Sequence, residues 1–301
     1  MNMKVDLCGV TLNNPVMTAS GTFGSGAEYA EFVDLNKLGA VVTKGVANVP
    51  WSGNPTPRVA EVYGGMLNAV GLQNPGIDLF VERDIPFLKQ FDTKIMVNVC
   101  GHSTEEYIEV VERLRDQPVD LLEINISCPN VKEGGIAFGQ DPKAVEAITK
   151  EMKKHAAQPV IMKLSPNVTD ITEMARAAEA GGADGLSLIN TITGMKIDIN
   201  RQKFVLANKT GGMSGPAIHP VAVRMVYQTA QAVRLPIVGM GGIMNAEDAI
   251  EMILAGATAV SVGTANFTNP HVAEEIVAGI RDYMERYQVA DIRDLVGAVH
   301  E

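Results

Sequence analysis

Polar side chains follow short aliphatic runs at many points of this 301-residue sequence. They are Ser20, Lys44, Asn98, Asn125, Lys163, Asn190 and Thr191. Such aliphatic runs are typical of strands buried in a parallel sheet, whose carboxyl ends lie at one edge. A surface position would not explain why ammonium, amide and hydroxyl groups all stand at the same end of a strand. We therefore expect these side chains to surround one pocket.

Two of these residues are lysines that follow aliphatic runs, Lys44 in VVTKG and Lys163 in VIMKLS. A buried ammonium group requires a partner, because removing it from water is costly. The partner could be a carboxylate within the fold, an anionic ligand such as a phosphate or reduced flavin, or a substrate carbonyl that forms an aldolase-type Schiff base on Lys163. We favour the anionic ligand, because Glu123 is the only carboxylate in a neighbouring run.

Glycines cluster after the last two aliphatic runs, in GMGGI at residues 239–243 and in VGTA at residues 262–265. Backbone N–H groups at these two places form the usual phosphate site of β/α barrels. Simple tight turns are the alternative. The dinucleotide pattern Gly-x-Gly-x-x-Gly is absent, so a mononucleotide or sugar phosphate is favoured.

Cys128 follows the fourth run within the segment NISCPN. Cys8, Cys100 and Cys128 are too few and too scattered for a disulfide framework or a zinc site. We expect Cys8 and Cys100 to be small core residues, whereas Cys128 should lie in a loop beside the pocket. Among the histidines only His102 stands at the edge of a run, so we expect no metal site and no Cys-His pair.

Eight aliphatic runs alternate with longer amphipathic stretches, a pattern that predicts an α/β fold of the (β/α)8 TIM-barrel type forming one domain over residues 1–301. The runs cover residues 15–20, 40–44, 94–100, 121–127, 159–165, 185–190, 236–240 and 259–263. Residues 5–12 alternate around Gly9 and predict a small hairpin at the barrel bottom. Long insertions follow runs two and six, at residues 45–86 and 191–220. We expect them to form lids or substrate-binding walls rather than decorative loops.

Start and stop signals support the helices between these runs. Ser103 with Glu106 forms a capping box, and Asp141 and Asn269 each precede a proline suited to the first helical position. Asn245 is expected to cap the helix after run seven, and Gly256 to end it.

The net charge of −10 argues against a nucleic-acid partner, because nucleic-acid binders carry basic surfaces. The sequence has no apolar run of membrane-spanning length and no charged-then-apolar leader. We therefore expect a cytoplasmic protein.

Four motifs, in this order, resemble the family 1 dihydroorotate dehydrogenases: GNPTPR (53–58), NAVGLQNPG (68–76), NISCPN (125–130) and IVGMGGIMNAEDAIEMILAGA (237–257). The resemblance implies that the chain binds FMN. The residues that would hold the flavin are Ser20, Lys44, Gly45, Asn98, Asn125, Lys163 and Ile189, with Gly215, Gly241, Gly242, Gly263 and Thr264 around its phosphate. Lys163 would then stabilise the negative charge of the reduced flavin.

The resemblance also implies oxidation of dihydroorotate to orotate in pyrimidine synthesis. Cys128 would remove the C5 proton while the C6 hydride passes to flavin N5. The substrate would contact Lys44, Asn68, Ala69, Val70, Gly71, Leu72, Asn125, Asn190 and Thr191. Amide side chains suit a cyclic urea edge because they both donate and accept hydrogen bonds.

The segments FGSGAEYAEF (23–32) and TKGV (43–46) are similar to the branch of this family that passes electrons to a second subunit. That subunit would carry FAD and a 2Fe-2S cluster and reduce NAD, in a heterotetramer of two catalytic and two electron-transfer subunits. The fumarate-using branch, a dihydropyrimidine dehydrogenase-like barrel and a non-redox aldolase barrel remain open as alternatives. A nonenzymatic scaffold would not explain the ring of lysines and amides.

Overall fold

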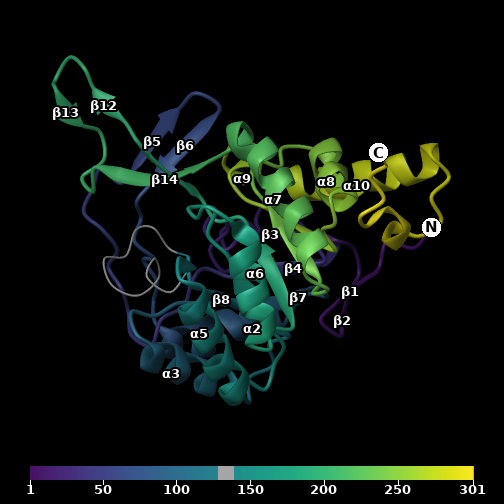
Figure 1. The fold of residues 1–301 in the computed structure, drawn as a ribbon, viewed down its shortest axis with the longest axis horizontal. Helices are drawn as coiled ribbons and strands as arrows, with labels where there is room; N and C mark the ends of the chain where they lie inside the picture. Colours follow the sequence, from purple (N-terminus) through teal and green to yellow (C-terminus); the bar gives the residue numbers. More distant parts are fainter. Residues whose placement is uncertain (128–138, 301) are drawn as a thin grey trace.

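The structure is a computed structural model that describes residues 1–127 and 139–300 (Figure 1). Cys128, the predicted proton acceptor, lies outside the described residues. Eight parallel strands close into a barrel, as predicted. In barrel order they are β3 (Val16–Thr18), β4 (Ala40–Val42), β7 (Lys94–Val99), β8 (Leu121–Asn125), β9 (Val160–Lys163), β10 (Gly185–Leu188), β15 (Ile237–Met240) and β16 (Ala259–Val262). Each strand falls within one of the eight aliphatic runs.

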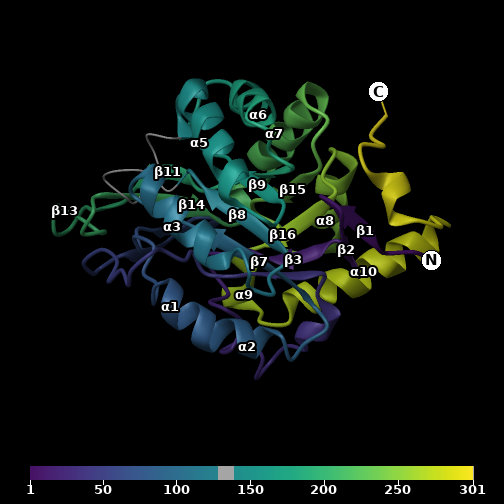
Figure 2. The same ribbon diagram turned by 90° about the horizontal axis from the view of Figure 1, so that it is seen from below.

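Helices surround the barrel and bury one apolar face each against it (Figure 2). They are α1 (Ile77–Leu79), α2 (Ile85–Leu88), α3 (Thr104–Leu114), α5 (Pro142–His155), α6 (Ile171–Ala180), α7 (His219–Ala232), α8 (Ala246–Leu254), α9 (Ala265–Thr268) and α10 (Val272–Arg286), with a π-helical turn at Phe80–Asp84. Short 3₁₀ helices occur at Leu35–Lys37, Pro216–Ile218 and Ile292–Leu295.

Most of the predicted helix ends are confirmed. Ser103, Asp141 and Asn245 each accept a hydrogen bond from a backbone N–H in the first turn of α3, α5 and α8. Gly256 follows α8 with a φ of 123°. The prediction for Asn269 is wrong in position. Its side chain accepts from the His271 N–H, which forms a turn, and α10 begins only at Val272.

The predicted N-terminal hairpin is present as β1 (Val5–Leu7) paired with β2 (Val10–Leu12). Cys8 and Gly9 form its turn, both with positive φ, as a tight two-residue hairpin requires. A side chain on Gly185, the first residue of β10, would meet the Cys8 sulfur at 2.7 Å. The hairpin therefore packs against the amino-terminal end of the barrel, where the chain enters its strands.

Burial raises the pKa of the Cys8 thiol to about 12, and the charges of Asp184 and Asp6 act in the same direction. A raised acid pKa means that folding favours the protonated thiol. This contribution is complete below the ordinary value of 9.0 and is lost as pH rises toward 12. The free energy of unfolding should therefore fall in wild type when the pH rises from 7.5 to 10.5. In Cys8→Ala this fall should be smaller by on the order of 1 kcal/mol. Urea unfolding in reducing buffer would measure this, and equal losses in both proteins would contradict it.

The two long insertions form one four-stranded antiparallel sheet, in the order β11-β14-β6-β5. Its strands are β5 (Val59–Val62), β6 (Gly65–Asn68), β11 (Ile192–Met195) and β14 (Thr210–Ser214). We call it the roof sheet, because its residues line the outer side of the cavity described below. It has a small core of its own, made of Leu67, Ala69 and Leu206. The expectation that the insertions wall the pocket is confirmed, and their pairing with each other is new.

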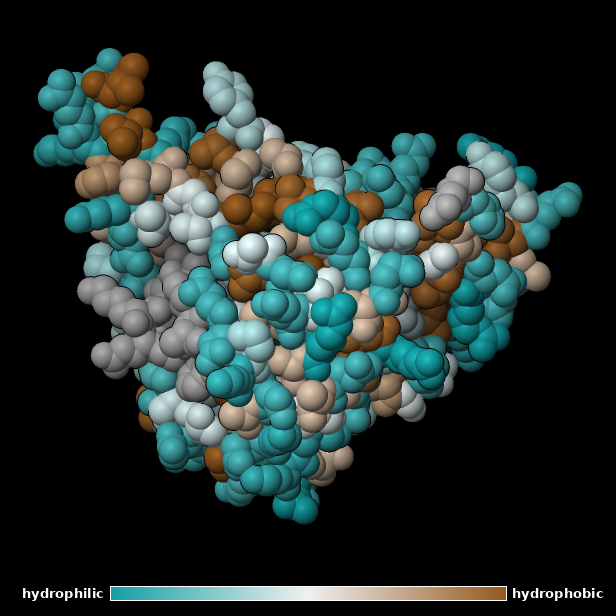
Figure 3. All heavy atoms as spheres, viewed as in Figure 1, coloured by the Kyte–Doolittle hydropathy of each residue, from teal (hydrophilic) through white to brown (hydrophobic). Residues whose placement is uncertain are grey.

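A second hairpin, β12 (Ile197–Asp198) and β13 (Lys203–Phe204), projects beyond the roof sheet (Figure 1). Hydrophobic atoms are visible at this tip in Figure 3, where Ile197, Ile199 and Phe204 are 53%, 82% and 46% exposed. Exposed apolar side chains grouped in this way are typical of surfaces that contact another protein. None of the helices in the described ranges has the length and apolar composition needed to cross a bilayer.

Candidate active site

A cavity of about 940 Å³ lies between the carboxyl ends of the barrel strands and the roof sheet. This is near the upper end of the usual range for ligand sites. Most of the predicted site residues line it: Ser20, Lys44, Gly45, Asn68, Val70, Gly71, Leu72, Asn125, Lys163, Ile189, Asn190, Thr191, Gly215, Gly241, Gly242, Gly263 and Thr264. Asn98 and Ala69 do not line it, because both are fully buried behind its wall.

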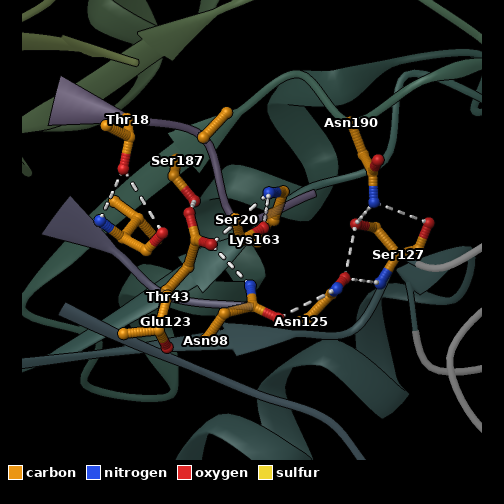
Figure 4. Close-up of polar contacts among 12 residues, drawn as sticks. Thr18, Ser20, Thr43, Asn98, Glu123, Asn125, Ser127, Lys163, Ser187 and Asn190 are labelled. Atoms are coloured by element: carbon orange, nitrogen blue, oxygen red, sulfur yellow. Dashed lines mark hydrogen bonds and ion pairs between the residues drawn. The ribbon is translucent and has the colours of Figure 1, made fainter. Parts of the chain in front are cut away.

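Lys163 has a carboxylate partner inside the barrel. Its Nζ lies 3.4 Å from Glu123 Oε2 and 3.1 Å from Ser20 Oγ (Figure 4). Glu123 is only 1% exposed. The sequence-based preference for an anionic ligand over an internal ion pair was therefore incomplete, since Lys163 makes the ion pair and also lines the cavity.

A chain of amide side chains leads from Glu123 to the wall of the cavity. Asn98 Nδ2 donates to Glu123 Oε2 at 2.5 Å, and Asn98 Oδ1 accepts from Asn125 Nδ2 at 3.3 Å. Asn125 Oδ1 accepts from the Ser127 hydroxyl at 3.3 Å and from its N–H at 3.4 Å. Asn190 Nδ2 donates to the Ser127 hydroxyl at 2.7 Å. Asn98 is therefore linked to the cavity wall through Asn125.

Gly45 lies where the chain passes closest to these amides. A Cβ on Gly45 would lie 2.9 Å from Asn98 Oδ1 and 3.3 Å from a methyl group of Leu72. Only glycine lets the backbone after Lys44 approach this closely. The close approach of the Gly45 backbone to Asn98 explains why glycine follows Lys44 at the end of the second aliphatic run.

The glycines after β15 and β16, together with Gly215, form a backbone cradle beside the amino terminus of α7. The cradle consists of Gly215, Gly241, Gly242, Gly263 and Thr264. Gly242 has a φ of 71°, and a Cβ there would lie 2.8 Å from the Gly215 carbonyl oxygen. Such closely packed glycine backbone at a helix amino terminus fits a phosphate group.

His219, the first residue of α7, connects the cradle to α8. Its Nδ1 lies 2.8 Å from the Gly241 carbonyl oxygen and its Nε2 3.1 Å from Glu251 Oε2. Asp248 lies close by, so three possible metal-ligand atoms fall within 4.8 Å of one another. Sequence reasoning did not anticipate this group. Because both ring nitrogens already face oxygen atoms, hydrogen bonding accounts for it and we assign no metal to it.

The fold and the cavity define a class of protein, a β/α-barrel enzyme with a glycine cradle and a charged centre at the strand ends. The family model for dihydroorotate dehydrogenase matches residues 2–284, and the chain belongs to this family. It is therefore a flavin-dependent oxidoreductase that oxidises dihydroorotate in pyrimidine biosynthesis.

Curated relatives are similar over nearly the whole chain. The catalytic subunit of dihydroorotate dehydrogenase B (NAD(+)) from Lachnoclostridium phytofermentans is 71% identical over 99% of this chain and 100% of its own length. The protein of the same name from Alkaliphilus metalliredigens is 64% identical over 99% of both chains. A crystal structure of dihydroorotate dehydrogenase from Eimeria tenella in complex with ferulenol has the same fold. It has a TM-score of 0.82 at 23% identity and covers 99% of this chain and 88% of that one.

Proposed function

We propose that this chain is a single FMN-binding domain, residues 1–301, that converts (S)-dihydroorotate to orotate and passes the electrons through a second subunit to NAD. The observation that carries the proposal is one cavity in which two lysines, a row of amides and the glycine cradle face one another. Each of these groups matches a part of the cofactor or the substrate.

FMN fits the residues that line this cavity, and it supplies the acceptor for a hydride. The cradle would hold the phosphate through backbone N–H groups. Lys163 and Ser20 stand in the barrel mouth, where Lys163 would face the pyrimidine edge of the ring. Gly45, Asn125 and Ile189 would complete the contact with the ring, and Asn98 would support it from behind Asn125.

The substrate carries a carboxylate and a cyclic urea. We assign the carboxylate to Lys44, which lines the cavity, and the urea edge to the amides of Asn68, Asn125 and Asn190. An amide offers both a donor and an acceptor, as the alternating groups of the urea require. Thr191 and the backbone of residues 70–72 would complete this binding surface, with Ala69 buried behind it.

We assign removal of the C5 proton to Cys128. What supports this is the residue before it. Ser127 is 1% exposed, and Asn125 and Asn190 hold it from two sides by hydrogen bonds. Ser127, which directly precedes Cys128 in the sequence, is therefore held by two residues that line the cavity. Removal of the C5 proton requires a base in contact with the reacting carbon.

A second subunit is proposed from the names of the relatives, which are catalytic subunits of an NAD(+) enzyme. The three cysteines here are too scattered to hold an iron-sulfur cluster, so FAD and a 2Fe-2S cluster would belong to the partner. We propose a heterotetramer of two catalytic and two electron-transfer subunits. The exposed apolar residues on the projecting β12–β13 hairpin offer one surface for contact between subunits.

Anaerobic mixing with dihydroorotate should bleach the flavin absorbance of the purified protein within one turnover. Dihydrouracil, which lacks the carboxylate, should bleach it far more slowly. Lys44→Met should weaken dihydroorotate binding and reduce the difference in bleaching rate between dihydroorotate and dihydrouracil. Continued NAD reduction should require the electron-transfer subunit. Fumarate should not serve as the electron acceptor in place of NAD. A protein that takes up no flavin, or that is reduced equally fast by both compounds, would overturn the proposal.

A further inference from the structure

Glu123 is a buried carboxylate for which the reaction itself has no direct use. It lies on β8 inside the barrel, 1% exposed, and it is not part of the cavity wall. Its Oε1 accepts from the Ser187 hydroxyl at 2.7 Å, and its Oε2 accepts from Asn98 and Lys163 (Figure 4). A charge buried this deeply is strongly unfavourable unless it is paired with an opposite charge and hydrogen-bonded.

The first consequence of this carboxylate concerns the orientation of the amides. A carboxylate only accepts hydrogen bonds, so Asn98 must turn its NH₂ group toward Glu123. The Asn98 carbonyl then faces the NH₂ group of Asn125, and the Asn125 carbonyl faces Ser127. Each amide thus fixes the direction of the next one. One charge sets the donor and acceptor pattern that the cavity presents.

The second consequence concerns charge. An ammonium has three N–H donors, and in the described part of the chain two of them are directed to Glu123 and Ser20. The carboxylate balances the lysine charge while the remaining side of the ammonium lines the cavity. The centre below the cavity floor is therefore a neutral pair rather than a lone positive charge.

We propose that Glu123 is a positioning residue that sets the reduction potential of the bound flavin and the orientation of the Asn98–Asn125 amides. The inference rests on the proposed FMN site. A flavin gains electrons on reduction, so a nearby negative charge disfavours the reduced form and a nearby positive charge favours it. Glu123 thus offsets the stabilisation that the Lys163 charge gives to the reduced flavin. The electrons can then pass more readily to the next acceptor.

Glu123→Gln keeps the size and one acceptor oxygen but removes the charge. It should shift the flavin redox equilibrium toward the reduced form by about tenfold, or about 30 mV for a two-electron couple. Lys163→Met should shift it in the opposite direction. The double variant should lie near wild type, because it removes both members of the pair. It also guards against misfolding, since removing both charges avoids the lone buried charge that each single variant leaves.

Ser187→Ala is the matched control. It removes a hydrogen bond to the same carboxylate, from a residue that is fully buried and outside the cavity wall, and leaves both charges in place. The flavin potential of this variant should stay at the wild-type value. FMN affinity, measured by fluorescence quenching on the flavin-free protein, should change by less than about threefold in Ser187→Ala.

The potential of each variant is measured by titration against a reference dye in the flavin-loaded protein. An unchanged potential in Glu123→Gln, or an equal shift in Ser187→Ala, would overturn the inference. If the folded single variant is not obtained, the double variant and Lys163→Met suffice, because their difference isolates Glu123. A wild-type protein that binds no flavin would instead defeat the proposed function, so the two failures are distinct.

Discussion

Replacing Cys128 with alanine should lower turnover with dihydroorotate by about 10²–10⁴-fold, the range that a positioned general base contributes. The protein should still fold and bind flavin, because the cradle and the Lys163 centre are built from other residues. Cys128→Ser should keep a little activity and require higher pH, since a hydroxyl loses its proton less readily. Wild-type activity should itself rise toward pH values near the ordinary thiol pKa of about 8.5.

Stopped-flow reduction of the bound flavin measures this step without the second subunit. The control is Cys100→Ala, which removes a thiol that is fully buried and outside the cavity wall. Its reduction rate should stay within a few fold of wild type. Near-normal flavin reduction by Cys128→Ala would show that another group accepts the proton.

Replacing Gly65 with alanine should raise the KM for dihydroorotate by about 10²-fold, because displacing a binding group by about 1 Å has effects of this size. A Cβ on Gly65 would lie 1.9 Å from the Ser214 carbonyl oxygen and 3.1 Å from the Gly215 Cα. Strands β6 and β14 must therefore separate in the variant. Separation would move Asn68 on β6 and Gly215 at the end of β14, so FMN affinity should also fall.

The control for this prediction is Gly194→Ala on β11 of the same sheet. A Cβ there meets a methyl group of Leu67 at 3.1 Å, and a flexible side chain can move aside. Its KM should change only severalfold. Thermal unfolding of Gly65→Ala should remain near wild type, because the roof sheet has its own small core. An unchanged KM in Gly65→Ala would contradict our assignment of the sheet as a wall of the site.

The barrel strands and most of the cavity could be predicted because their signals are local. Each strand lies within an aliphatic run. Lys163 is the last residue of β9, and Ser20 and Lys44 stand two residues after the ends of β3 and β4. Parallel strands bring such positions to one edge whatever the details of the loops. The prediction for Asn269 failed because a turn through His271 delays the helix, and a capping residue before proline looks the same in either case.

The role of Glu123 could have been found from alternation along its strand. Asn125 is predicted to surround the pocket, and side chains two residues apart share a face of a strand. Its partners could not be predicted, because Lys163 meets Ser20 across 143 residues only when the barrel closes. The roof sheet was missed for the same reason. Asn68 on β6 lies opposite Gly212 on β14, and neither glycine-rich strand shows a clear alternating pattern.

The closure of the barrel also determines when this protein can acquire its cofactor. Strand β3 pairs with β16, so the first barrel strand to be synthesised can complete its pairing only after the last one has been made. At roughly 5–20 residues per second, ribosomes take on the order of ten seconds or more to make the intervening chain. Ser20 follows β3 and Thr264 follows β16, so the two sides of the cavity meet only at that moment. We therefore expect cofactor loading to follow the synthesis of β16 rather than to guide the folding of the earlier strands.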